Sequence, residues 1–136
     1  MQLYRRPVRF EDVDAARIVF FARFFHYAHE ATESFFSGLH SGYDGLIMQR
    51  GLGFPVVKVE ASFQAPLRYG DALDIETRTL RIGTRSATLG FRLIRVSDQA
   101  LSAEIAHSVV MTNLSLMASC DMPDDVRSLL ASHLDA

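Results

Sequence analysis

One aromatic segment constrains the fold of this chain more than any other. Residues 18–37 read IVFFARFFHYAHEATESFFS, and at about 100° per residue their apolar side chains gather on one broad helical face. That face holds Phe20, Phe24, Tyr27, Ala28, Ala31 and Phe35, with Phe21, Phe25 and Phe36 at its border. Each large aromatic side chain buries on the order of 150 Å² or more. The pattern therefore predicts one long helix that a curved sheet must cover.

The chain after Pro55 is typical of strands. Apolar and polar residues alternate from Val56 to Gln64, which predicts a half-buried strand. Further strands are expected at Leu3–Phe10, Leu73–Ile82 (with a bulge near Arg78-Thr79), Ala87–Leu93 and Leu101–Leu114, and short helices at Tyr43–Arg50 and Pro123–Leu134. This order predicts an α+β protein, with an antiparallel sheet of five to six strands wrapped around one long central helix.

Length and charge restrict the class of protein. The 136 residues suit a single domain, 1–136, and a formal net charge of −2 argues against a protein that mainly grips nucleic acid. No apolar run approaches the roughly 18 residues of a membrane span, and no signal peptide is evident. Cys120 is the single cysteine, so an internal disulfide is excluded. We expect a cytoplasmic protein.

An acidic turn directly precedes the aromatic helix. Glu11, Asp12 and Asp14 crowd into four residues at the point where free backbone N–H groups of a helix start point outward. Such N–H groups can polarise a carbonyl, and a carboxylate beside them can act on it. Taken alone, an acid at this position is either a turn or capping residue or a catalytic carboxylate.

The sequence FEDVDAARIVFFARFF resembles the signature region of the 4-hydroxybenzoyl-CoA thioesterase family, which has the hotdog fold. The family pattern is Asp-x-x-Gly-[IV]-V-aromatic, and the later segment ASFQAPLRYGDALDIETRTLRIGTRSATLGFRL is similar to the family's central strands. The resemblance covers most of the chain and implies a single hotdog domain. One position departs from the pattern, because Arg17 stands where the family has glycine.

The resemblance implies an acyl-CoA thioesterase that hydrolyses a small aryl- or acyl-CoA thioester. It assigns the role of general base or nucleophile to Asp14 and the carbonyl-polarising N–H to Phe21. The residues that it implies for holding the coenzyme A arm are Arg81, Thr84, Arg85 and Ser86. Arg17 has the reach to pair with Asp14 or to contact the ligand. No metal or organic cofactor is implied, since coenzyme A is part of the substrate.

The resemblance also implies a homodimer or homotetramer whose active sites lie between subunits, with no nucleic-acid or membrane partner. Two other functions stay open. A hotdog hydratase or dehydratase would use His26 with Glu30 on the acyl chain. A non-catalytic acyl-CoA-binding subunit would result if Arg17 held Asp14. The pairs His26/Glu30 and His29/Glu33, each four residues apart, indicate a solvated or subunit-facing surface, a metal site, or a helix-borne catalytic carboxylate.

Overall fold

The computed structural model describes residues 1–134, and its main layer is a five-stranded antiparallel sheet. The strands lie in the order β1 (Gln2–Pro7), β4 (Ala72–Ile82), β5 (Ser86–Arg95), β6 (Leu101–Val110), β3 (Val56–Phe63). A small second sheet contains β2 (Leu52–Gly53), β7 (Thr112–Asn113) and β8 (Ala118–Ser119). The α+β class and the antiparallel sheet are confirmed.

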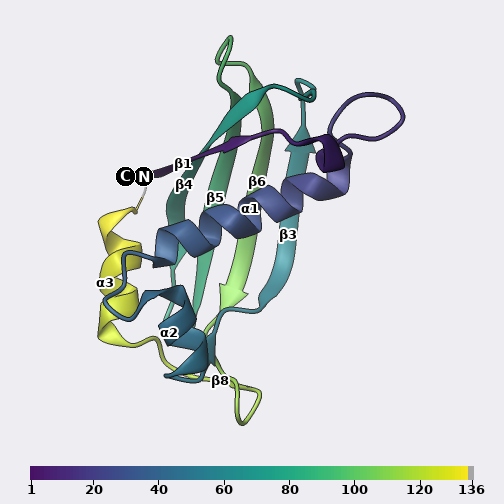
Figure 1. The fold of residues 1–136 in the computed structure, drawn as a ribbon. Coiled ribbons are helices and arrows are strands. Elements are labelled where there is room, and N and C mark those ends of the chain that lie inside the picture. The colour runs from purple at the N-terminus through teal and green to yellow at the C-terminus, as the bar shows by residue number, and fades with distance from the viewer. Residues whose placement is uncertain (135–136) are drawn as a thin grey trace.

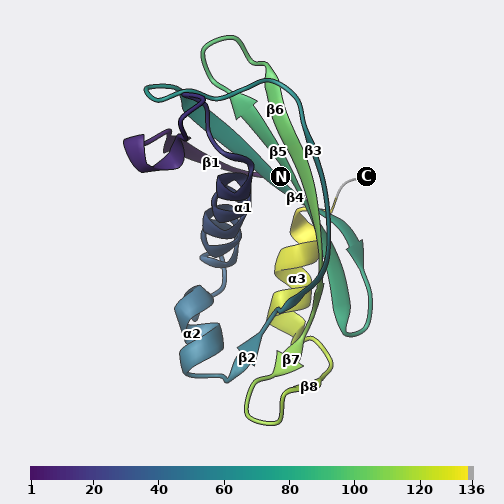
Figure 2. The same cartoon turned by 90° about the vertical axis from the view of Figure 1, so that its right-hand side faces the viewer.

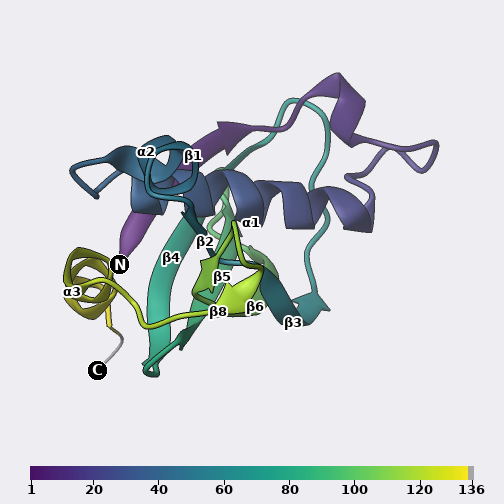
Figure 3. The same cartoon turned by 90° about the horizontal axis from the view of Figure 1, so that it is seen from below.

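Within residues 1–134, three α-helices accompany the sheet, where the sequence predicted one long central helix and two short ones. They are α1 (Phe21–Phe36), α2 (Gly42–Met48) and α3 (Asp124–Ser132), and a short 3₁₀ turn, η1 (Phe10–Asp12), precedes them. The longest helix, α1, runs across the strands on one side of the sheet (Figures 1 and 3). Its buried residues are Phe24, Tyr27, Ala28, Ala31, Phe35 and Phe36.

The start of α1 differs from the expected start at Ile18. The backbone before Phe21 is extended, because Val19 forms an antiparallel bridge with Val13 and its N–H donates to the Leu67 carbonyl. These contacts hold the residues before Phe21 in the extended region and delay the first helical turn. As a result, Phe20 and Phe21 are 38% and 65% exposed, and they lie at the helix start rather than in the core.

Several strand predictions need correction. The alternation predicted a half-buried strand at Val56–Gln64, but every residue of β3 is exposed. The reason is that β3 lies at the edge of the sheet and only its last residue, Phe63, meets aromatic rings of α1. The first strand ends at Pro7, and the last long strand ends at Val110, where the Met111 N–H turns to the Arg85 carbonyl. The expected bulge in β4 is confirmed, between Thr79 and Arg81.

No helix within residues 1–134 is both long enough and apolar enough to cross a membrane.

Candidate active site

The acidic turn is a short closed loop between η1 and α1. The Val13–Val19 bridge closes its base, the Asp14 N–H donates to the Ile18 carbonyl at 3.1 Å, and the Arg17 N–H donates to the Asp14 carbonyl at 2.9 Å. The loop therefore holds Asp14 in a defined place just before the helix.

The Asp14 side chain is exposed, and only one of its two carboxylate oxygens accepts a hydrogen bond within residues 1–134. Its Oδ1 accepts a hydrogen bond from the Ala16 N–H at 2.8 Å. None of the residues in the described part of the chain donates to its Oδ2. The two interpretations of this acid are thus compatible, since one oxygen orders the turn while the other faces solvent as a free acceptor.

The helix that follows the acidic turn begins with a free donor, seven residues after Asp14 in the chain. The Phe20 N–H donates to the Asp12 carbonyl at 3.2 Å, which ties the last extended residue to the acidic turn. The Phe21 N–H is the first of α1, and no acceptor for it is found among residues 1–134. Such an N–H carries part of the positive end of the helix dipole. It can donate to a developing oxyanion.

Arg17 adopts a left-handed backbone with φ of 66°. This conformation is easy for glycine and costs roughly 1–2 kcal/mol for other residues, which explains why the resembling family has glycine at this position. The Arg17 side chain is exposed, and the ion pairs found within residues 1–134 do not include it. The contact that would hold Asp14 in a non-catalytic subunit is therefore not made in the described structure.

We expect Arg17→Gly to stabilise the protein by about 0.5–1 kcal/mol in urea unfolding. Relief of the left-handed strain outweighs the added freedom of a glycine in the unfolded chain. Ala16→Gly is the matched control, because Ala16 has no left-handed φ. That change should destabilise by a similar amount. Equal unfolding free energies for the two variants would contradict the strain argument.

The residues expected to hold coenzyme A lie far from the acidic turn within one chain. The turn adjoins the start of β4, since the Val8 N–H donates to the Asp71 carbonyl and Pro7 pairs with Ala72. The segment 81–86 lies at the other end of β4, whose 11 residues span roughly 30 Å. Figure 2 shows η1 at the top of the view and the connection between β4 and β5 at the bottom.

The side chains of this distant segment differ in their engagement. The Arg81 Nη2 makes one long contact, 3.4 Å, with the Ser86 Oγ. Arg85 is held by the Asp121 carboxylate at 2.8 Å and by Ser119. The Thr84 carbonyl accepts from the Arg127 guanidinium at 3.1 Å. Of the group, Arg81 thus has the guanidinium that is most available to a phosphate.

Sequence reasoning missed the role of Asp12, which it took for a turn residue. Asp12 is fully buried and accepts hydrogen bonds from the Arg6 guanidinium and, at 2.8 Å, from the Arg9 N–H. Burial raises the pKa of the Asp12 carboxyl, but the bonds from Arg9 and Arg6 outweigh it and hold the pKa below its usual value. A signal was present in the sequence, because Arg6 shares strand parity with Tyr4 and Val8, which face inward.

The histidines and glutamates of α1 were candidates for hydratase chemistry or for a metal site, and the structure gives them other surroundings. Glu30 accepts from Arg6 at 3.0 and 3.1 Å and from the Tyr4 hydroxyl at 2.9 Å, so it is not free to act with an exposed His26. His29 and Glu33 are exposed. Residues 1–134 contain no group of three or more His, Cys, Asp or Glu side chains able to hold a metal ion.

Comparison with known proteins agrees with the resemblance to a thioesterase family. Residues 8–130 match the model of the thioesterase-like superfamily. A 1,4-dihydroxy-2-naphthoyl-CoA hydrolase from Picosynechococcus sp. is 28% identical over 131 residues, which cover 93% of this chain and 90% of that protein. A hydrolase of the same name from Synechococcus elongatus is 30% identical over 105 residues, covering 76% of this chain and 77% of that protein.

Solved structures agree with the sequence comparisons. A gentisyl-coenzyme A thioesterase superposes with a TM-score of 0.84 and 28% identity, covering 95% of this chain and 99% of that chain. A 1,4-dihydroxy-2-naphthoyl-CoA thioesterase from Synechocystis superposes with a TM-score of 0.86 over 95% of this chain and 94% of that chain. At 24% identity, this second likeness concerns the fold alone.

Proposed function

The chain belongs to the thioesterase-like superfamily, and from this premise we propose that it is an acyl-CoA thioesterase acting on a small aryl-CoA thioester. One observation carries the proposal. The exposed Asp14 carboxylate, with one free oxygen, stands just before the unpartnered N–H of Phe21 at the start of α1. Thioester hydrolysis needs this combination of a base or nucleophile and an oxyanion donor.

The proposed reaction uses the two groups in sequence. Asp14 takes a proton from water while the water oxygen attacks the thioester carbonyl carbon, and the Phe21 N–H stabilises the oxyanion that forms. The C–S bond then breaks, and the proton passes from Asp14 to the leaving thiolate. In the alternative with Asp14 as nucleophile, its oxygen attacks the same carbon and the C–S bond breaks, which releases the thiolate of coenzyme A. Water then hydrolyses the resulting mixed anhydride to the free acid and restores the Asp14 carboxylate.

An aromatic surface beside the helix start favours an aryl acyl group. The Phe63 ring lies 6.4, 5.2 and 6.3 Å from the rings of Phe21, Phe24 and Phe25, each in an edge-to-face or steeply tilted arrangement. Phe21 and Phe63 remain 65% and 45% exposed. Flat acyl rings pack well against such edges and faces. The relatives named above act on dihydroxynaphthoyl-CoA and gentisyl-CoA, both hydroxylated aromatic acyl groups.

The proposed enzyme is a homodimer that pairs through β3. This strand is exposed along its whole length, with Val57 at 65% and Val59 at 45%, and it forms one edge of the sheet. An exposed apolar edge strand is a ready site for pairing with another strand. Antiparallel pairing of two β3 strands reverses the partner sheet, so the partner's β4–β5 turn comes to the end that carries Asp14.

That arrangement would unite the two groups of candidate residues. Asp14 and Phe21 would come from one subunit, and Arg81, Thr84, Arg85 and Ser86 from its partner. Arg17, exposed in the loop, would lie at the same end and could meet the ligand. Guanidinium groups suit the phosphates of coenzyme A. The proposed enzyme needs no metal or organic cofactor.

A panel of thioesters tests the function. Release of free thiol is followed with a thiol-reactive dye for benzoyl-, hydroxybenzoyl- and dihydroxynaphthoyl-CoA beside acetyl-, hexanoyl- and palmitoyl-CoA. We expect kcat/KM for the best aryl thioester to exceed that for the straight-chain ones by at least about tenfold. No thiol release from any substrate would reject the enzyme. Preference for a straight chain would reject the aryl pocket. Absorbance changes with crotonyl-CoA would instead indicate a hydratase.

A further inference from the structure

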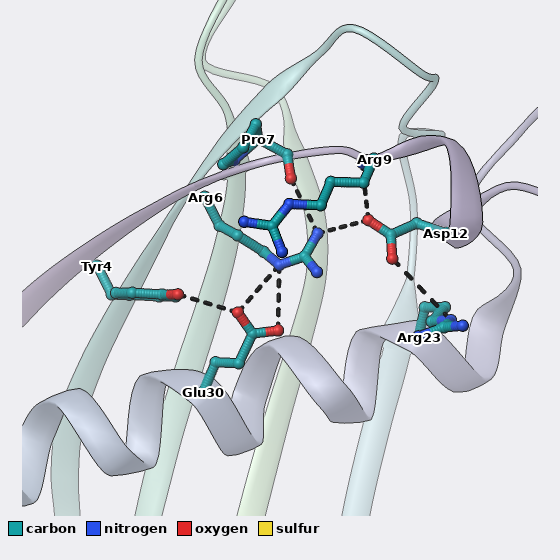
Figure 4. A network of polar contacts seen from close by, with 7 residues as sticks. All are labelled: Tyr4, Arg6, Pro7, Arg9, Asp12, Arg23 and Glu30. Atoms are coloured by element: carbon teal, nitrogen blue, oxygen red, sulfur yellow. Dashed lines mark hydrogen bonds and ion pairs between the residues drawn. The ribbon is translucent and has the colours of Figure 1, made fainter.

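Several charged side chains are joined beneath the acidic turn, between β1, η1 and α1 (Figure 4). Together with the Tyr4 hydroxyl, which donates to Glu30, they form what we call the Arg6 network: Tyr4, Arg6, Asp12, Arg23 and Glu30. Its two arginines balance its two carboxylates. The family pattern Asp-x-x-Gly-[IV]-V-aromatic aligns with residues 14–20 and contains none of these five residues, and the proposed chemistry does not use them either.

Arg6 is the centre of the network. Its side chain is only 6% exposed, and its Nη1 donates to the Asp12 Oδ2 and, at 2.9 Å, to the Pro7 carbonyl. Its Nε donates to both oxygens of Glu30, and its Cζ lies 4.5 Å from the centre of the Tyr27 ring. The guanidinium thus joins the strand, the turn before Asp14 and the middle of α1.

Asp12 transmits this anchoring to the reacting groups. Its side chain receives bonds from Arg6 and from the Arg9 N–H, and its backbone carbonyl accepts from the Phe20 N–H at 3.2 Å. Asp12 stands two residues before Asp14, and Phe20 stands one before Phe21. Any shift of Asp12 therefore moves both the carboxylate and the oxyanion donor.

We propose that Arg6 is a positioning residue for thioester hydrolysis, acting through Asp12 on Asp14 and the Phe21 N–H. This inference rests on the proposed function. Replacement of a buried ion pair by apolar residues is often neutral for stability, so stability alone gives little reason to bury these charges. Their geometry instead fixes the separation of base and donor. A misplacement of about 1 Å between reacting groups can lower a rate by about a hundredfold.

Arg6→Ala is the test, and Arg5→Ala is the control for the loss of an arginine–carboxylate contact from the same strand. Arg5 makes an equally close two-bond contact with Asp74, at 2.7 and 2.9 Å, but has no link to the turn. We expect Arg6→Ala to lower kcat by about 30–100-fold with KM within about threefold, and Arg5→Ala to leave kcat within about twofold. Because Arg6→Ala leaves a guanidinium-sized space, millimolar guanidinium chloride should restore part of its kcat, whereas sodium chloride should not.

Two further variants keep the inference falsifiable if Arg6→Ala fails to fold. Arg6→Lys keeps the positive charge but loses the planar guanidinium that donates through both Nε and Nη1. Asp12→Asn keeps the shape of the side chain but loses its negative charge. Both should lower kcat more than KM rises. Unchanged kcat in folded Arg6→Lys and Asp12→Asn would overturn the positioning role, as would equal losses in Arg6→Ala and Arg5→Ala. A wild-type protein without turnover would overturn the proposed function instead, and with it the catalytic role of Arg6.

Discussion

Asp14→Asn should lower kcat by about 10²–10⁴-fold against the best aryl thioester. The amide cannot accept the proton of the attacking water or act as a nucleophile. Its oxygen can still accept the bond from the Ala16 N–H, so the turn should persist. We therefore expect an unchanged circular dichroism spectrum and a KM within about threefold of the wild-type value, which locates the loss in the chemical step.

Glu11→Gln is the control for this variant. Glu11 belongs to the same acidic turn and is exposed. Like Asp14→Asn, the change Glu11→Gln removes one negative charge from this turn. Its kcat should stay within about twofold of the wild-type value if the effect at Asp14 is chemical rather than a general change of charge. Full activity of Asp14→Asn would reject Asp14 as base or nucleophile. A comparable loss in both variants would assign the effect to the charge of the turn.

Local pattern was enough to predict most elements of the fold. The helical face from Phe24 to Phe36 is set by spacing along one helix, and each strand core is set by alternation along one segment. The antiparallel sheet follows, since short turns join most of its strands. The exposure of β3 was beyond such reasoning. Alternation shows that Val57 and Val59 share a face, but it cannot show whether α1 of the same chain covers that face.

The candidate site divides in the same way. Asp14 and Phe21 follow from a contiguous motif, and the structure places them on one short loop and the helix after it. The sequence marked Arg17 only as a departure from the family glycine, and the structure shows that its backbone is left-handed there. The buried ion pair of Asp12 could not be predicted from the motif, because its partner Arg6 lies on a preceding strand. The second carboxylate that Arg6 binds, Glu30, is 24 positions further along the chain than Arg6. A buried ion network is a property of three packed elements.

A mixed dimer should show that each active site is shared between two subunits. The double change Arg81→Ala with Arg85→Ala removes one guanidinium group from the end of β4 and one from the β4–β5 turn. It should lower kcat/KM by at least about tenfold through lost phosphate contacts. We expect KM to account for most of this loss. Asp14→Asn removes the carboxylate from the other end of the sheet. Each homodimer is then impaired for a different reason.

Heterodimers of the two variants, purified through two different affinity tags after co-expression, separate the two possible architectures. If the site is shared, one of the two sites combines Asp14 of one subunit with the intact turn of the other, and kcat/KM recovers to about half of the wild-type value. If each site lies within one chain, no site is intact, and the heterodimer cannot exceed half of the arginine double variant. The two outcomes differ by at least about tenfold. A monomeric wild-type protein in light scattering would also contradict pairing through β3. It would contradict the shared site as well, because roughly 30 Å of sheet separates Asp14 from the β4–β5 turn within one chain.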